Sequence, residues 1–202
     1  MDKEVIFKAL NIKKIQTVSS EYSKEDEYKY FCSIAESLTD NFMATKNLNL
    51  LYNELIKWCH TEGNKGYFIA GLPRKGKTTA INILASYLLL KEIKYSLDKV
   101  VFFKTFRCYN VCEHYVSTGE ISSFLEPDFV CFDDLGTEPT ESIYMGNRIG
   151  VMRQIIEARE DMKDKITFYT SNFQIDDPEL MRRYGERAMK RIIERNNYFE
   201  FK

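Results

Sequence analysis

The segment 71–78 constrains the fold of this chain more than any other part of the sequence. An apolar run, 67–70, precedes it, and a helix-like stretch, 76–91, follows it. A glycine-rich loop between a strand and a helix is typical of a phosphate site, because its backbone N–H groups and the positive end of the helix face an anion. The loop reads Gly71, Leu72, Pro73, Arg74, Lys75, Gly76, Lys77 and Thr78, which matches G-x-x-x-x-G-K-[ST] at every fixed position.

The fixed positions of this loop have defined parts in holding a nucleoside triphosphate. Lys77 is expected to reach the β- and γ-phosphates, and the Thr78 hydroxyl is expected to bind Mg²⁺. The whole loop and the following Thr79 are therefore the candidate nucleotide-binding residues. Arg74 and Lys75 add positive charge at positions that small residues often fill, and they also crowd the loop. The alternative is a chance turn, rich in glycine and lysine, before a helix.

Short apolar runs alternate with longer amphipathic stretches from residue 67 onward. The runs are 67–70, 100–104, 129–132, 166–170 and 198–201, and the stretches are 76–91, 106–125, 147–164 and 178–195. Strands that alternate with helices predict an α/β fold, with a parallel sheet and helices on both of its faces. Ligands bind at the carboxyl ends of the strands in such sheets. Further helices are expected in the first part of the chain, near 4–15, 24–38 and 47–60.

Two acidic residues follow the third apolar run. Asp133 and Asp134 come directly after Phe129–Phe132, which is the pattern of a Walker B motif. A carboxylate here can hold hydrated Mg²⁺ opposite Thr78, which suits Asp133. A second carboxylate can orient or deprotonate the attacking water, so we assign that role to Asp134. Taken alone, two acids after a strand also fit a solvated turn, but together with the loop they favour nucleotide binding and hydrolysis.

Asn172 is a candidate for a contact with the γ-phosphate or the attacking water. It follows the fourth apolar run, next to the strand that is expected to carry the magnesium ligand. Its amide equally suits a cap on the turn that follows, which is common chemistry for asparagine.

The basic segment 182–195 predicts a helix beyond Gly185. The positions expected to be buried are Ala188, Met189, Ile192 and Ile193. On the other side, arginines recur every four residues: Arg187, Arg191 and Arg195. They fit either a solvated charged face or an arginine finger that completes the site of a neighbouring subunit.

The composition excludes several classes of protein. The chain has 202 residues and a formal net charge of -1, so a strongly basic nucleic-acid binder is not indicated. The longest apolar stretch, near Ile83–Leu90, is about one third of a membrane span, and the charged start lacks the apolar core of a secretory signal. We therefore expect a cytoplasmic protein with no membrane partner. Cys108, Cys112 and His114 admit a zinc site, but the spacing of the cysteines also fits buried thiols on one helix face.

With these motifs, residues 47–202 resemble the DnaC/IstB type of AAA+ ATPases, which are bacterial and phage helicase loaders and transposition helper ATPases. The matching segments are GLPRKGKT at 71–78, FVCFDDLGTE at 129–138, YTSN at 169–172 and YGERAMKRI at 184–192. The resemblance implies a P-loop core of the ASCE/AAA+ type, with five parallel strands in the order 5-1-4-3-2.

The resemblance also implies roles for individual residues. Asn172 matches sensor 1, and Arg191 matches the arginine finger that acts in trans, with Arg187 as the second candidate. The region 106–125 matches a helical insertion that loaders place near single-stranded DNA. There Phe106, Arg107 and Tyr109 either contact the DNA or form the core and surface of an ordinary helix.

The chain departs from the family pattern at several points. Arg74 stands where the family usually has glycine, and Asp134 stands where AAA+ proteins often have glutamate, which leaves loop geometry and the rate of turnover open. No lid domain and no sensor 2 arginine are expected, because Lys202 follows directly on the fifth strand. Residues 1–46 form a separate helical extension and a candidate partner-binding region, before an ATPase core at 47–202.

The sequence therefore predicts an ATPase that uses ATP and Mg²⁺ and loads or remodels a hexameric replicative helicase on single-stranded DNA. Subunits are expected to associate through Arg191, and the monomer to bind DNA weakly. A transposition helper of the same family is one alternative, and a nucleotide-dependent adaptor with little hydrolysis is another. A P-loop phosphotransferase acting on a small molecule is disfavoured, because the sequence has no signature of an acceptor pocket or closing lid.

Overall fold

The computed structural model describes residues 24–39, 45–59, 65–90, 94–95, 99–100 and 103–202. The expected helix at 4–15 lies outside these residues. The chain forms two compact units, one of Asn64–Thr78 with Phe102–Lys202 and the other of Met1–Gly63 with Thr79–Val101. The first unit contains the sheet and every predicted site residue except Thr79, which belongs to the second unit.

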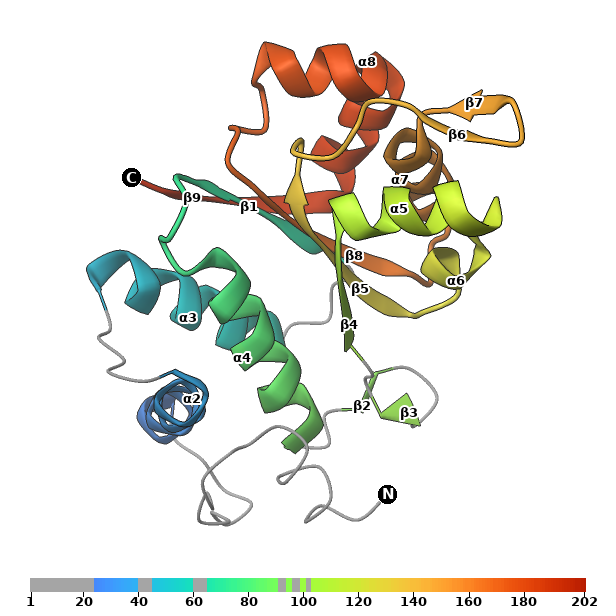
Figure 1. Ribbon diagram of the computed structural model, residues 1–202. Coiled ribbons are helices and arrows are strands. Elements are labelled where there is room, and N and C mark those ends of the chain that lie inside the picture. Colours follow the sequence, from blue (N-terminus) through green and yellow to red (C-terminus); the bar gives the residue numbers. More distant parts are fainter. Residues whose placement is uncertain (1–23, 40–44, 60–64, 91–93, 96–98, 101–102) are drawn as a thin grey trace. The chain divides into compact units, whose positions relative to one another are not determined.

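A five-stranded parallel sheet forms the centre of the first unit (Figure 1). Its strands are β1 (Gly66–Gly71), β4 (Phe103–Arg107), β5 (Phe129–Leu135), β8 (Ile166–Ser171) and β9 (Asn196–Phe201). Neighbouring strands follow the order β4-β5-β8-β1-β9, and every pair is parallel. All of β8 and nearly all of β1 and β5 are buried, as is usual for parallel strands.

The five strands correspond to the five predicted apolar runs, with shifted ends. The second begins at Phe103 rather than at residue 100, and the fifth begins at Asn196 rather than at 198. The predicted order 5-1-4-3-2 numbers only the strands of this sheet. The labels β1 to β9 also count four short strands outside it, so the two sets of numbers differ. Counted only among its own members, the sheet runs 2-3-4-1-5, which is the predicted order read from the opposite edge.

Four helices accompany this sheet in the first unit: α5 (Cys108–Thr118), α6 (Ser122–Leu125), α7 (Val151–Asp161) and α8 (Pro178–Arg195). The amphipathic stretch at 106–125 forms two helices, because Gly119 adopts a left-handed backbone (φ 77°) and ends α5, and the first two residues of the stretch belong to β4. The prediction that residue 147 begins a helix is wrong. Residues 142–149 form a hairpin of β6 (Ser142–Tyr144) and β7 (Asn147–Ile149), and the turn between them has positive φ at both central residues.

The last helix, α8, begins and breaks at positions that the sequence marks. Pro178 occupies its first turn, and the side chain of Asp177 accepts a hydrogen bond from the Glu179 N–H at 2.8 Å. The helix is interrupted at Gly185, whose φ of 80° and ψ of 162° are not helical. The second segment, beyond Gly185, is the basic helix that the sequence predicts.

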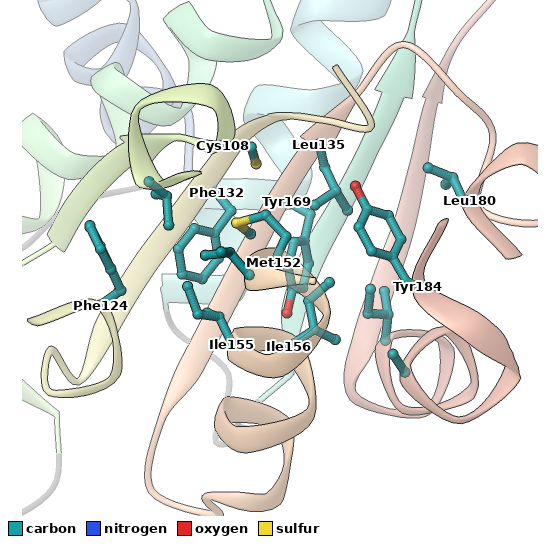
Figure 2. Packing of buried hydrophobic residues seen from close by; sticks show 14 of the residues in the cluster. Cys108, Phe124, Phe132, Leu135, Met152, Ile155, Ile156, Tyr169, Leu180 and Tyr184 are labelled. Carbon is teal, nitrogen blue, oxygen red and sulfur yellow. The ribbon is translucent and has the colours of Figure 1, made fainter. Parts of the chain in front are cut away.

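The main core lies between the sheet and helices α5, α7 and α8, which lie on the same face of it (Figures 1 and 2). Alternate strand residues enter it, including Phe68 and Ala70 from β1 and Val130 and Phe132 from β5. The thiols of Cys108 and Cys112 are buried in this core and form no disulfide. Among the described residues, no group of three or more His, Cys, Asp or Glu gathers at a metal-binding distance.

The second unit contains α2 (Lys24–Leu38), α3 (Lys46–Cys59) and most of α4 (Lys77–Leu90), with a short pair of strands, β2 (Lys94–Tyr95) and β3 (Lys99–Val100). The ring of Phe31 lies 4.9 Å from that of Tyr52 and 5.3 Å from that of Tyr87, so one side chain joins the three helices. The division of the chain between residues 46 and 47 stays a prediction. No helix in the described ranges is long and apolar enough to cross a membrane.

Candidate functional site

The glycine-rich loop joins β1, which ends at Gly71, to α4, which begins at Lys77. Gly71 has a φ of 148°, and a Cβ at this position would lie 2.6 Å from the Cβ of Phe201 on β9. Gly76 has a φ of 91°, a conformation that side-chain-bearing residues rarely adopt. The two fixed glycines are therefore required by a close strand contact and by the backbone turn.

Replacing Gly71 by alanine is expected to destabilise the fold by about 2–4 kcal/mol, because the new methyl group meets Phe201 and the backbone is strained. Urea unfolding measures this change. The neighbouring exposed Leu72 provides the control, since Leu72→Ala should alter the unfolding free energy by less than about 0.5 kcal/mol. Equal stabilities for the two variants would contradict the role given to Gly71.

Arg74 adopts a left-handed backbone with a φ of 64°, and its side chain is exposed. This explains why glycine suits the position, because a residue with a Cβ pays roughly 1–2 kcal/mol there. Lys75 is exposed as well, so the two basic side chains lie on the surface of the loop and do not fill it.

The ammonium group of Lys77 is bound to the backbone at the start of the glycine-rich loop. Residue Lys77 is 4% exposed, and its ammonium group donates hydrogen bonds to the carbonyl oxygens of Gly71 and Leu72 (3.0 Å to the latter). Its third bond goes to Oδ1 of Asn172, at 2.9 Å. Burial lowers the pKa of Lys77, and the nearby carboxylates of Asp134 and Asp133 oppose that shift.

The first acid of the pair, Asp133, lies at the carboxyl end of β5 and is almost fully buried. Its Oδ1 atom accepts hydrogen bonds from the hydroxyls of Thr78 at 2.7 Å and Thr170 at 2.6 Å. The structure thus brings the two predicted magnesium ligands together. Thr170 has no role in the motifs described above, although it stands two residues before Asn172 in the YTSN segment.

A hydroxyl and a carboxylate oxygen so close together fit Mg²⁺. This ion prefers oxygen ligands and usually takes one or two carboxylates, completing its shell with substrate phosphates and water. Thr78 and Asp133 supply such a partial set of ligands beside Lys77, where phosphates would lie. The donor set therefore agrees with the predicted cofactor pair of ATP and Mg²⁺.

The second acid, Asp134, has an unusual backbone. Its φ is 58°, and the register between β5 and β8 shifts between Phe132 and Leu135. Its N–H donates to the Thr170 hydroxyl at 3.0 Å. Burial and the charge of Asp133 raise the pKa of the Asp134 carboxyl, while the cations Lys77 and Arg107 act in the opposite direction. The carboxylate of Asp134 therefore lies close enough to Lys77 and Asp133 for their charges to act on it.

The four elements that meet here are the ends of β1, β5 and β8 and the start of α4. Among the predicted site residues, Lys77 is bonded to Asn172 and Thr78 to Asp133, and the charge of Asp134 acts on Lys77. This arrangement is the one expected at the carboxyl edge of a parallel sheet.

The structure places the predicted arginines of α8 elsewhere. Arg191 pairs with Asp161 at 2.7 Å and donates to the Glu157 carbonyl oxygen at 2.7 Å, so it contacts α7 and not the loop of its own chain. Arg187 is exposed, and no described residue pairs with it. The predicted buried stripe is confirmed for the other three positions but is wrong for Ile193, which is 46% exposed.

The candidate DNA-contacting residues divide into two groups. Phe106 packs against the core, with its ring 5.0 Å from that of Phe124 and 6.4 Å from that of Phe132. The core interpretation therefore holds for this residue. Arg107 and Tyr109 are exposed, so only these two remain candidates for contact with nucleic acid.

No protein-family model and no curated protein matches the sequence. Among solved structures, the fold matches a protein assigned as a primosome component from Streptococcus pyogenes serotype M3, with a TM-score of 0.61 and 18% identity over 82% of this chain and 85% of that chain. It also matches the DnaC helicase loader, with a TM-score of 0.57 and 19% identity over 81% of this chain and 95% of that chain. A third match is the AMPPCP-bound DnaA from Aquifex aeolicus, with a TM-score of 0.55 and 13% identity over 81% and 49%. The chain therefore shares the fold of these proteins, and the match to the DnaC helicase loader confirms the resemblance to the DnaC type at the level of the fold.

Proposed function

We propose that this protein is an ATPase of the DnaC type that loads or remodels a hexameric replicative helicase on single-stranded DNA in the cytoplasm. One observation supports it most: at the carboxyl ends of adjacent parallel strands, Lys77 is hydrogen-bonded to Asn172 and the neighbouring Thr78 to Asp133. In support, the fold is that of a DnaC helicase loader and of a DnaA that binds the nucleotide analogue AMPPCP.

The binding step follows from the donors in the loop. The backbone N–H groups between Gly71 and Lys77 would surround the β- and γ-phosphates. Lys77 would exchange its present carbonyl partners, Gly71 and Leu72, for phosphate oxygens, which are stronger partners because they are charged. Thr78 and Asp133 would hold Mg²⁺, which neutralises charge that develops on the phosphates.

In the hydrolysis step, the carboxylate of Asp134 would act as the base. Water attacks the γ-phosphorus, the bond from phosphorus to the β–γ bridging oxygen breaks, and ADP and phosphate are the products. The carboxylate of Asp134 would accept a proton from that water. Asn172, already bonded to Lys77, would orient the water or the γ-phosphate.

Arg191 is proposed to complete the site of a neighbouring subunit, with Arg187 beside it on the exposed face of α8. In the isolated chain Arg191 is bound to Asp161 and to the end of α7. Assembly would therefore replace a partly exposed ion pair by a contact with phosphate, an exchange that favours the more charged partner.

Releasing Arg191 is expected to promote that assembly. The variant Asp161→Asn should raise the ATPase rate by about 2–5-fold at protein concentrations where self-association limits turnover, because exposed ion pairs contribute up to about 1 kcal/mol. The rate is measured against protein concentration. Glu157→Gln is the matched control, since the Arg191 contact with residue 157 uses its backbone carbonyl. An unchanged or lower rate in Asp161→Asn would contradict the release.

Co-purification with the host replicative helicase, with and without ATP, tests the function itself. The proposed loader should bind the helicase and respond to ATP, and the variant Lys77→Ala should lose that response. A chain that binds a transposase and never the helicase would instead be a transposition helper. A complex that responds to ATP but never hydrolyses it would identify a nucleotide-dependent adaptor, a possibility that the strained backbone of Arg74 and Asp134 favours.

A further inference from the structure

Glu138 is a buried carboxylate that has no part in the proposed binding and hydrolysis of ATP. It is 2% exposed and lies just beyond the two acids of β5, on the loop that follows the strand. One oxygen, Oε2, accepts the N–H of Gly136 at 2.9 Å, and the other, Oε1, accepts the hydroxyl of Tyr184 on α8. Both oxygens of the carboxylate therefore have a donor, as a buried charge requires.

The first of these donors belongs to a tight turn that begins at Asp134. The Asp134 carbonyl oxygen accepts hydrogen bonds from the N–H of Thr137 at 3.2 Å and from its hydroxyl at 2.7 Å. Gly136, inside the turn, has a φ of 99°, and a Cβ there would lie 2.8 Å from the ring of Phe173. Glu138 thus holds the middle of the turn from which the Asp134 side chain projects.

The second donor fixes the same carboxylate to α8. Tyr184 is 3% exposed within the core and is the last residue before the break at Gly185 (Figure 2). The neighbouring Arg183 donates to the backbone carbonyl of Glu138 at 2.8 Å and pairs with Glu179 at 3.0 Å. Residue 138 is therefore held to α8 through both its side chain and its backbone.

Asp134 needs such support because its backbone is left-handed, with a positive φ. Aspartate tolerates this conformation better than most residues, but it remains uncommon and is kept where the surroundings hold it. Thr170 holds the N–H of Asp134 from the sheet side, and the turn bonded to Glu138 holds the other end. Without the second anchor, the turn is free to relax and the carboxylate to move from its position beside Lys77.

We propose that Glu138, held by Tyr184, is a positioning residue that keeps Asp134 in place for hydrolysis. This inference rests on the proposed ATPase function. It adds a role for a buried Glu–Tyr pair that has no part in the proposed binding and hydrolysis steps. The pair also ties the turn after β5 to the helix that carries Arg187 and Arg191.

The variant Tyr184→Phe tests the pair, because it removes one hydroxyl and keeps the ring. Its kcat should fall about tenfold while the Kd for ATP stays within about twofold. Tyr169→Phe is the matched control: Tyr169 donates to buried Glu160 at 2.8 Å in the same core, a bond of the same kind that lies away from the turn. Its kcat should stay within about twofold of the wild type. Equal losses of kcat in the two variants would overturn the proposal.

Two variants of Glu138 separate positioning from packing. In Glu138→Gln the amide oxygen can accept the Gly136 N–H while the amide nitrogen donates to the Tyr184 oxygen, so kcat should stay within about threefold. Glu138→Leu keeps the bulk without any acceptor and should lose at least about tenfold. A glutamine variant as slow as the leucine variant would mean that hydrogen-bond geometry is not the role of this residue.

Amide hydrogen exchange gives a readout that needs no turnover. In Tyr184→Phe the amides of Asp134 and Gly136 should exchange at least about tenfold faster than in the wild type, and in Tyr169→Phe they should not change. Unchanged exchange in Tyr184→Phe would overturn the proposal even if ATP is hydrolysed. A wild-type protein that never hydrolyses ATP would reject the ATPase function, and the exchange rates would still decide whether Glu138 anchors the turn.

Discussion

Replacing Asp134 by asparagine is expected to lower the turnover of ATP by about 100- to 10,000-fold, the range that a positioned general base contributes. The amide has nearly the same shape but cannot accept the proton of the attacking water. ATP should still bind, because Lys77, Thr78 and Asp133 make their contacts without it. Multiple-turnover assays and nucleotide titrations measure the two quantities separately.

The same variant should not be less stable than the wild type at neutral pH. Burial and Asp133 raise the pKa of Asp134 in the folded state, so its ionised form is less favourable there than in the unfolded chain. Stability from this group is present at low pH and declines as the pH rises from the unfolded pKa, near 3.8, to the folded one. Asparagine does not ionise, so the variant lacks this cost in the folded state. For the wild type, turnover should fall at low pH, where Asp134 becomes protonated and can no longer accept a proton.

The exposed Asp164 supplies a control for Asp134, since Asp164→Asn should change neither turnover nor stability. Thermal unfolding at pH 7 completes the comparison. If Asp134→Asn still hydrolyses ATP at the wild-type rate, a different group activates the water. If it unfolds well below the wild-type temperature, the raised pKa is not the right account of its surroundings.

Replacing Lys77 by alanine is expected to weaken ATP binding by at least about 100-fold, which corresponds to about 2.7 kcal/mol of charge-assisted contacts with phosphate. The variant Lys77→Arg should bind ATP almost as weakly as Lys77→Ala. The ammonium now fits between the carbonyl oxygens of Gly71 and Leu72, and a planar guanidinium is too large for that place. Titration with a fluorescent ATP analogue measures the dissociation constants.

Lys75 is the matched control, because it has the same charge, lies two residues away and is exposed. Lys75→Ala should weaken binding by less than about fivefold, the effect of a screened surface charge. Equal losses at positions 75 and 77 would show that the loop attracts nucleotide only by its general charge. Unchanged binding in Lys77→Ala would remove the basis for a phosphate loop.

Local pattern was enough to predict the sheet and most of the site. Burial on both faces turns each parallel strand into a short apolar run, and the end of such a run marks the edge where ligands bind. Asp133 could be selected for that reason because it follows a run directly, and Asn172 because it stands two residues after another; Lys77 was selected by the pattern of the loop that follows the first run. The hairpin at 142–149 could not, because its turn depends on positive φ at Met145, a residue type that does not favour it.

The sequence by itself determined which residues can contact a triphosphate, because the spacing of glycines, lysine and acids is a local property of strand–loop–helix units. Only the tertiary structure decided how they are held. Thr170 reaches Asp133 on the neighbouring strand, Glu138 reaches Tyr184 across 46 residues of chain, and Arg191 is bound to α7. Such partners are set by how strands and helices pack, and nothing in the local pattern around any one of these residues encodes the identity of the other.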